Sequence, residues 1–247
     1  MPLYTYPPLH LGTLVKRYKR FFADIELDTG ELITAHCPNT GPMTGVCQIG
    51  APVMVSYNDN PKRKLRYTWE TIEVESTSPS RLGDRVWVGI NTALPNRLVK
   101  IALEQHLFPE LEPYTTIRSE VVYGQNNRSR VDFVLTGESG LTYVEVKNTT
   151  WTIDDVAVFP DTETTRGQKH LQELTDILTV QDNPDRAVML YLINRGDMTK
   201  FSPGDTTDPL YAKLLRTAVA KGLQVLPCRF DVTPQGVEYL GLAELVL

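Results

Sequence analysis

The sequence of 247 residues lacks the features that mark several classes of protein. Its three cysteines, Cys37, Cys47 and Cys228, have no CxxC spacing, which argues against a disulfide framework and a zinc ribbon. His36 does not change this, because its spacing from the cysteines matches no usual tetrahedral zinc set. No apolar run approaches the roughly 20 residues of a membrane helix. The N-terminal MPLYTYPPLH lacks the basic start and apolar stretch of a signal peptide. We therefore expect a cytoplasmic protein without a membrane partner.

Neither sign of charge is in large excess. The 25 basic and 30 acidic side chains give a net charge of −5, which by itself speaks against binding nucleic acid. Residues 1–84 carry nine basic and nine acidic side chains, so the remainder holds all the net negative charge. Local basic clusters attract phosphate more than the total charge suggests. We therefore predict that two clusters in the neutral part bind nucleic acid: Lys16, Arg17, Lys19 and Arg20, and Lys62, Arg63, Lys64 and Arg66.

The first 83 residues have the pattern of a small β-barrel. Strand-like runs alternate with turn residues and contain no convincing helix; they lie at 14–22, 23–27, 31–35, 52–57 and 65–75. This pattern predicts a barrel of the OB type. Tyr18, Phe21 and Phe22 accompany the first basic cluster, and OB barrels bind nucleic acid through cations and stacking aromatic rings. A solvated strand edge protected by charge is the alternative.

From residue 84 onward the pattern becomes that of an α/β domain. Helical spacing of apolar residues predicts helices at 95–108, 166–179 and 209–221. Strand-like runs lie at 117–124, 130–136, 141–148, 187–194, 223–232 and 237–247. This order predicts a mixed sheet flanked by helices. The segment STSPS (76–80) is typical of a junction, and we expect the chain to divide into residues 1–83 and 84–247.

The candidate catalytic residues lie in two of these strands, RVDFVL and LTYVEVKN, joined by the turn TGESG. A hairpin symmetric about this turn pairs Asp132 with Glu145, with Cβ atoms about 4.5–5.5 Å apart. The period of two places Lys147 on the same face. The other face is then wholly apolar and consists of Val131, Phe133, Val144 and Val146. Two carboxylates this close repel each other. A divalent cation, Mg²⁺ (or Mn²⁺), would relieve the repulsion by taking both carboxylates and the Val146 carbonyl.

Lys147 would project beside this cation, where it would orient or deprotonate an attacking water or stabilise phosphoryl charge. In the same register Arg130 lies opposite Lys147, an unfavourable pair of cations unless an anion such as phosphate sits between them. Arg128 adds to this positive field. The alternative is an exposed sheet on which these side chains are simply solvated.

The order of helices and strands, together with Asp132, Glu145 and Lys147, resembles the PD-(D/E)XK (restriction-endonuclease-like) superfamily. The proline that often precedes the Asp is replaced by Val131, at no cost in ligands. The whole chain is similar to the sugar fermentation stimulation protein A family. The matching segments are AHCPNTGPM (35–43), RVDFVL (130–135), YVEVKNTT (143–150), VFPDTETTRGQKHLQEL (158–174) and AVMLYLIN (187–194). The resemblance implies an OB-like domain, a nuclease-like domain, DNA binding without strong sequence preference, and regulation of sugar (maltose) metabolism.

The helix at 166–179 often contributes a polar or basic residue to the site in this superfamily, which makes Gln168 and Lys169 catalytic candidates. They begin the helix together with Arg166 and His170, where free N–H groups favour a phosphate; a solvated helix face is the alternative. Asp161 would supply a further metal or water contact, or serve as a turn or cap residue.

Three functions stay open. The first is a DNA-binding protein with a Mg²⁺-dependent phosphodiester hydrolase site, with RNA as the other nucleic acid to consider. The second is a DNA-binding transcriptional regulator that keeps the nuclease fold and does not cut. The third is a metal-dependent hydrolase of a small phosphorylated substrate. The oligomeric state is open as well, and a homodimer is among the states that the sequence allows.

Overall fold

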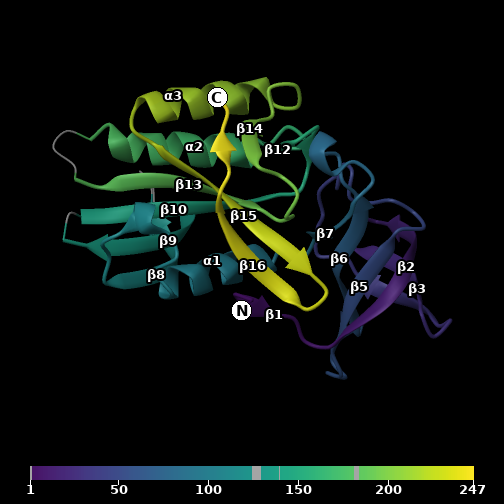
Figure 1. The fold of residues 1–247 in the computed structure, drawn as a ribbon. Helices are drawn as coiled ribbons and strands as arrows, with labels where there is room; N and C mark the ends of the chain where they lie inside the picture. The colour runs from purple at the N-terminus through teal and green to yellow at the C-terminus, as the bar shows by residue number, and fades with distance from the viewer. Residues whose placement is uncertain (1, 124–128, 139, 181–183) are drawn as a thin grey trace.

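The computed structural model describes residues 2–123, 129–138, 140–180 and 184–247 (Figure 1). The helices of these residues are α1 (Leu94–Glu104), α2 (Thr165–Leu178) and α3 (Pro209–Ala220), with short 3₁₀ turns η1 (Pro79–Arg81) and η2 (Pro109–Leu111). The first strands are β1 (Tyr4–Thr5), β2 (Leu9–Tyr18), β3 (Phe22–Leu27), β4 (Leu32–His36), β5 (Pro52–Tyr57), β6 (Tyr67–Glu75) and β7 (Arg85–Gly89). The later strands are β8 (Thr116–Tyr123), β9 (Ser129–Gly137), β10 (Gly140–Thr149), β11 (Thr152–Ile153), β12 (Val156–Phe159), β13 (Arg186–Ile193), β14 (Lys200–Pro203), β15 (Gln224–Thr233), β16 (Gly236–Leu242) and β17 (Glu244–Leu245).

The N-terminal part is an OB barrel, as the turn-rich pattern predicts. Its strands follow the order β4-β3-β2-β5-β6, and a parallel pairing of β4 with β6 closes it. Alternate residues of β3 point inward, so that Ala23, Ile25 and Leu27 are buried in the barrel core. The predicted strand at 14–22 is too long, because β2 ends at Tyr18. Lys19 and Arg20 follow with φ of 49° and 63°, the left-handed conformation that makes a tight hairpin turn.

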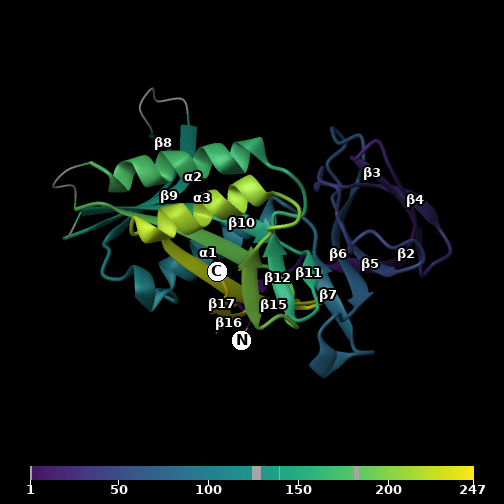
Figure 2. The same cartoon turned by 90° about the horizontal axis from the view of Figure 1, so that it is seen from above.

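The C-terminal part is the predicted mixed sheet with helices on both faces. Strands β10, β13 and β15 are parallel neighbours, whereas β9 and β8 continue the sheet in antiparallel fashion. Helices α2 and α3 lie side by side on one face and α1 covers the other (Figures 1 and 2). Strand β13 is buried on both faces, which explains its continuous apolar sequence.

One sheet runs through both parts of the molecule. Strand β7 pairs with β6 of the barrel and, through Trp87 and Val232, with β15. Val86 and Val88 of β7 pack in the barrel core, whereas Tyr6 packs in the core beneath α1. The barrel stands beside the C-terminal part in Figure 2. The predicted domain boundary between residues 83 and 84 stays a prediction, because strand β7 directly after it pairs with strands of both parts.

Several elements differ from the sequence-based expectation. A small second sheet, β11-β12-β14-β17, is not predicted by the sequence. Its strands β11, β12 and β14 lie in segments that the strand pattern leaves unassigned, and the predicted strand at 237–247 is divided into β16 and β17. Helix α1 ends at Glu104 rather than at residue 108, and His106 just beyond it has a φ of 53°. Helix α3 ends before Gly222, which has a φ of 101° in the position that favours glycine. Within the described residues, no helix combines the length and apolar character needed to cross a membrane.

Candidate active site

Strands β9 and β10 separate at Asp132. Their ladder follows the predicted symmetric register as far as the pair Phe133–Val144. Beyond that pair, the Val146 N–H donates to Asp132 Oδ2 at 2.7 Å. The carboxylate thus replaces a main-chain acceptor of β9 at the point where the strands fork. Because the N–H and C=O of one strand residue point the same way, the Val146 carbonyl faces the same fork.

Three details of the predicted hairpin are wrong because of this fork. In the described ladder, the pairs that would follow Phe133–Val144 do not form. Val131 packs in the core beneath α2, whereas Phe133 packs in the core beneath α1, so the two do not share one apolar face. Arg130 pairs with Val122 of β8 on one side, and its predicted pairing with Lys147 of β10 does not form in the described ladder.

Glu145 is buried and lies at the centre of the site. Lys147 Nζ donates to Glu145 Oε1 at 2.6 Å, and His170 Nδ1 of α2 bonds the same oxygen. Arg166 Nε donates to His170 Nε2 at 3.4 Å, so Nδ1 carries the proton that His170 gives to Glu145. Among the described residues, Glu145 Oε2 is buried without a hydrogen-bond partner. One oxygen of the Glu145 carboxylate therefore has two hydrogen-bond partners, whereas the other has none among the described residues.

The two carboxyl groups have opposite electrostatic environments. Burial raises the pKa of Asp132, and the charge of Glu145 raises it further. Burial alone would raise the pKa of Glu145 as well, but the hydrogen bond from His170 and the charge of Lys147 outweigh it and lower this pKa. Asp132 is therefore the carboxyl that gains most from a nearby cation.

A cavity of about 430 Å³ opens beside these carboxylates. It is lined by Glu120, Ser129, Arg130, Asp132, Glu145, Arg166, Lys169 and His170. Three cations, Arg130, Arg166 and Lys169, therefore face the same space as the two acids. A phosphate group in this cavity would be attracted to the three basic side chains and repelled by the two carboxylates. A bound metal cation would remove that repulsion by neutralising the carboxylates.

Sequence reasoning did not select His170 as a catalytic candidate. Arg166, Lys169 and His170 recur at helical spacing, so one face of α2 points them toward the cavity. That spacing is a signal that could have identified His170. Asn96 of α1 was also missed: its Nδ2 donates to Asp132 Oδ1 at 2.7 Å. Asn96 stands alone in the first turn of α1, so no helical spacing of polar residues marks it as part of a site.

The structure does not bring Gln168 or Asp161 to this cavity. Gln168 Nε2 donates to Asp208 Oδ1 and Oδ2 at 2.9 and 3.0 Å, which ties α2 to the beginning of α3. The predicted capping role of Asp161 belongs to Thr164, whose hydroxyl accepts from the Gly167 N–H. Burial raises the pKa of Asp161, and the nearby main-chain N–H of Thr44 in the barrel lowers it in part.

The first basic cluster divides into exposed cations and one structural arginine. Arg17 Nη2 donates to the carbonyls of Asn39 and Gly41, both at 2.9 Å, and so holds the loop after β4. Lys16 lies over the Tyr18 ring, 5.4 Å from its centre. Lys19 and Arg20 are exposed at the β2–β3 turn.

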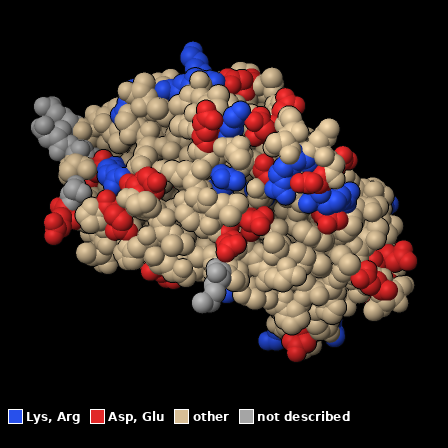
Figure 3. Space-filling model, in the orientation of Figure 1, with Lys and Arg blue, Asp and Glu red and all other residues tan. Residues whose placement is uncertain are grey.

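The second cluster is also mixed. Arg63 Nη2 donates to the Thr68 hydroxyl and Arg66 Nη1 to the Tyr57 hydroxyl, both at 2.9 Å. Lys62 and Lys64 are exposed. Arg128 lies outside the described residues. Positive and negative side chains are interspersed on the face shown in Figure 3.

Comparison with known proteins identifies both parts of the chain. Residues 93–236 match the model of the sugar fermentation stimulation protein RE domain, and residues 15–90 match the SfsA N-terminal OB domain. The chain belongs to the sugar fermentation stimulation protein family. It is 62% identical over 247 residues to the sugar fermentation stimulation protein homolog of Nostoc sp., covering 99% of this chain and 98% of the relative. The homolog of Synechocystis sp. is 60% identical over 247 residues, covering 99% of both chains.

The fold is also that of a solved member of the family. The structure of Pyrococcus furiosus SfsA in complex with Ca²⁺ covers 100% of both chains with a TM-score of 0.85 at 23% sequence identity. The arrangement of an OB domain beside a mixed sheet is thus shared with that archaeal family member.

Proposed function

We propose that this family member binds DNA with little sequence preference and hydrolyses phosphodiester bonds at the fork of β9 and β10 with the help of Mg²⁺ or Mn²⁺. One observation carries the proposal: Glu145 lines the cavity with a buried carboxylate oxygen that has no hydrogen-bond partner within the described part of the chain. A buried, unpaired polar atom is costly and calls for a ligand, and Asp132 lies at the same fork.

The residues at the fork fit a divalent cation. Asp132, the free oxygen of Glu145 and the Val146 carbonyl would hold it, and all three are oxygen donors. Among the described residues, no group of three or more His, Cys, Asp or Glu side chains is placed to hold a metal. Mg²⁺ commonly uses only one or two carboxylates and completes its shell with water and substrate phosphate. Pyrococcus furiosus SfsA was solved with Ca²⁺. When bound, the ion would neutralise the two acids and acidify a bound water.

The neighbouring side chains would orient the reactants. Lys147, fixed by its 2.6 Å bond to Glu145, would hold the attacking water or stabilise phosphoryl charge. His170 would keep the Glu145 carboxylate in one orientation, because it bonds one oxygen and leaves the other without a partner among the residues that the structure describes. Arg130, Arg166 and Lys169 would bind the phosphates that flank the scissile bond.

The barrel would supply most of the sequence-independent affinity. Lys16, Lys19 and Arg20 are exposed on β2 and its turn, and Tyr18 stacks on Phe22 with ring centres 5.4 Å apart. Cations and aromatic rings of this kind bind the backbone and bases of nucleic acid without reading sequence. A role in regulating sugar (maltose) metabolism, in keeping with the family name, would then be exerted on DNA.

The experiment combines cleavage with binding. We expect Mg²⁺-dependent cleavage of DNA by the wild type, tested on single and double strands and on RNA. Glu145→Gln and Asp132→Asn should each lose it by about 100-fold or more, the usual size of a lost transition-state contact. Glu138→Gln, in the exposed β9–β10 turn, is the matched control and should keep full activity. Gel shifts in EDTA measure binding separately.

Each other outcome selects one of the remaining functions. Binding without cleavage of any DNA or RNA form, unchanged by Asp132→Asn, would favour the non-catalytic regulator. Failure to bind nucleic acid would favour a metal-dependent hydrolase of a small phosphorylated substrate. The cavity of about 430 Å³ is the observation that keeps this last function in view, because pockets for small ligands have about 300–1,000 Å³.

A further inference from the structure

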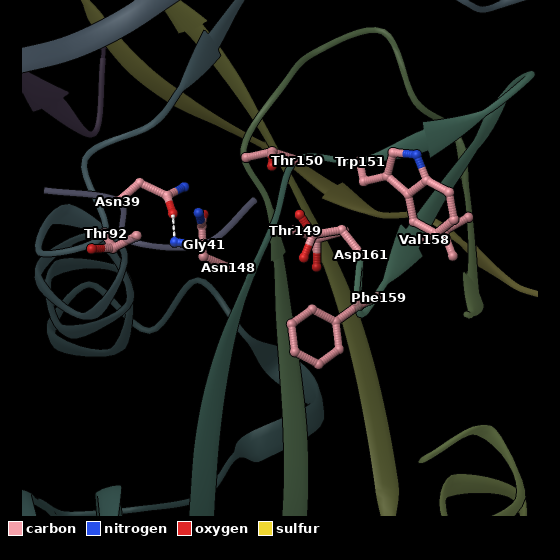
Figure 4. A pocket seen from close by; sticks show the side chains of 10 residues that line it. All are labelled: Asn39, Gly41, Thr92, Asn148, Thr149, Thr150, Trp151, Val158, Phe159 and Asp161. Carbon is pink, nitrogen blue, oxygen red and sulfur yellow. Dashed lines mark hydrogen bonds between the residues drawn. The ribbon is translucent and has the colours of Figure 1, made fainter. Parts of the chain in front are cut away.

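A second cavity, of about 110 Å³, lies where the barrel meets the C-terminal part (Figure 4). We call it the junction pocket. The loop after β4 contributes Asn39 and Gly41 to its lining, and the end of β10 contributes Thr149. Phe159 of β12 and Asp161 line it from the opposite side in Figure 4. The pocket therefore exists only because the two parts of the chain pack together.

The barrel side of the junction pocket is fixed before any ligand arrives. Arg17 holds the carbonyls of Asn39 and Gly41 at 2.9 Å. The Gly41 N–H donates to Asn39 Oδ1 at 2.9 Å, drawn as a dashed line in Figure 4. The Thr92 hydroxyl donates to the Pro38 carbonyl at 2.9 Å. A pocket with restrained walls loses little entropy when it binds.

The junction pocket continues the active-site face of β10. Alternate residues of a strand share a face, so Thr149 follows Glu145 and Lys147 on the side that meets α2. At about 3.3 Å per residue, Thr149 lies roughly 7 Å along the strand from Lys147 and roughly 13 Å from Glu145. A nucleic-acid strand with a phosphate at Lys147 would therefore have a neighbouring nucleotide at this pocket.

The lining has an unpaired polar group that points to a ligand. Thr149 is buried, with 1% of its surface exposed, and its hydroxyl has no hydrogen-bond partner among the described residues. Thr149, Asp161 and Phe159 all line the pocket, and Figure 4 draws their side chains. Phe159 is itself anchored on Tyr191 and Tyr211, with ring centres 5.6 and 5.3 Å away. A flat ring that carries N–H groups would bond the Asp161 carboxylate and the Thr149 hydroxyl and would pack against the Phe159 ring.

The volume of the junction pocket indicates the size of the ligand's ring, and its charged residue indicates which groups the ring carries. An apolar cavity of about 150 Å³ holds one benzene molecule, so about 110 Å³ with an open side suits a single six-membered ring better than a purine. Asp161 is the charged residue of the lining. A carboxylate accepts from the amino group of cytosine. At the same position thymine presents a carbonyl oxygen, which a carboxylate repels.

We infer that the junction pocket binds one unpaired pyrimidine base, cytosine in preference to thymine, from the strand whose phosphate lies at Lys147. This inference rests on the proposed nucleic-acid function and adds a base preference to it. Asp161 accepts from the exocyclic amine, Phe159 contacts the ring, and Thr149 bonds the exocyclic carbonyl oxygen or a ring nitrogen. The preference acts on single-stranded or locally opened substrate, because a paired base does not expose this edge.

The test measures binding of the full chain in EDTA to three single strands of equal length: oligo-dC, oligo-dT and an abasic strand. We expect oligo-dC to bind about tenfold more tightly than oligo-dT, a difference of about 1.4 kcal/mol, and the abasic strand to bind most weakly. Asp161→Asn should abolish or reverse the preference, because its amide can donate to thymine. Asp28→Asn, an exposed change of equal charge in the β3–β4 turn, should retain it.

Thr149→Val provides a second variant of equal shape and should weaken oligo-dC binding several-fold while leaving the abasic strand unaffected. Equal binding of all three strands by the wild type would overturn the pocket inference and leave the proposed function intact. A cytosine preference that survives Asp161→Asn would overturn it as well. Failure to bind every strand, together with absence of cleavage, would instead refute the proposed function.

Discussion

Replacing Asp197 by alanine should destabilise the protein strongly, because it leaves Arg195 charged and buried without its partner. Arg195 Nε and Nη2 donate to the two carboxylate oxygens of Asp197 at 2.6 and 2.7 Å. The exposed fractions of the two side chains are 3% and 0%. Ser76 at the end of the barrel donates to the same carboxylate at 2.7 Å, and Arg195 donates to the Thr150 carbonyl at 3.3 Å. The pair therefore links the barrel to the C-terminal sheet.

The structure supplies a matched control for this change. Arg216 and Asp205 also form a pair through two hydrogen bonds, from Nη1 and Nη2 at 2.6 and 2.8 Å, but with exposed fractions of 39% and 54%. Breaking a buried pair costs about 3–5 kcal/mol, and breaking an exposed one about 0–1 kcal/mol. At about 2–4 °C per kcal/mol for a chain of this length, Asp197→Ala should lower the unfolding midpoint by roughly 6–20 °C. Asp205→Ala should lower it by less than about 4 °C.

Urea and thermal unfolding followed by circular dichroism measure both changes. If Asp197→Ala is no less stable than Asp205→Ala, burial does not set the cost and the reasoning is wrong. The double change Arg195→Met with Asp197→Ala gives a further check. It should recover part of the lost stability, because the unpaired charge is then gone.

The same pair predicts a dependence on pH. Burial alone would raise the pKa of Asp197, but the hydrogen bond and charge of Arg195 lower it below the ordinary 3.8. A carboxyl whose pKa is lowered by folding stabilises the folded state above its unfolded pKa and loses that contribution as it is protonated. The stability difference between wild type and Asp197→Ala should thus be complete at neutral pH and shrink below about pH 4. A difference that grows in acid would contradict this.

Three further changes test other contacts. Gly89→Ala should destabilise by about 1–3 kcal/mol in urea unfolding, because a Cβ at Gly89 would lie 2.3 Å from Asn194 Oδ1. Asp208→Ala should cost about 2 kcal/mol, because Asp208 caps α3; cleavage per folded molecule should not change. Lys169→Gln should reduce the salt dependence of DNA binding by about one phosphate contact, whereas Lys213→Gln on α3 should leave it unchanged.

The local parts of the candidate site could be read from the sequence. The TGESG turn and the alternation of RVDFVL with LTYVEVKN fixed the hairpin register that the structure has at Phe133 and Val144. Because side chains of a strand alternate between its two faces, the same pattern placed Glu145 and Lys147 on one face. There Lys147 Nζ lies 2.6 Å from Glu145 Oε1. These are interactions between neighbours in sequence.

Contacts between distant segments were not readable in the same way. Gln168 and His170 are two residues apart in one helix, yet His170 bonds Glu145 and Gln168 bonds Asp208. The helical pattern gives the angle between the two side chains but not which partner each will meet. The role of Arg17 was likewise missed, because a basic cluster does not reveal that one member bonds the loop carbonyls of Asn39.

The sequence by itself determined most of the helices and strands, the two classes of fold and the placement of Glu145 and Lys147 on one face, because periodicity and turn chemistry act over a few residues. The tertiary structure alone decided that β9 and β10 fork at Asp132, that β7 joins both parts in one sheet, and that Thr149 meets the barrel loop at a shared pocket. Those outcomes depend on how complementary surfaces far apart in the chain pack, which no local pattern encodes.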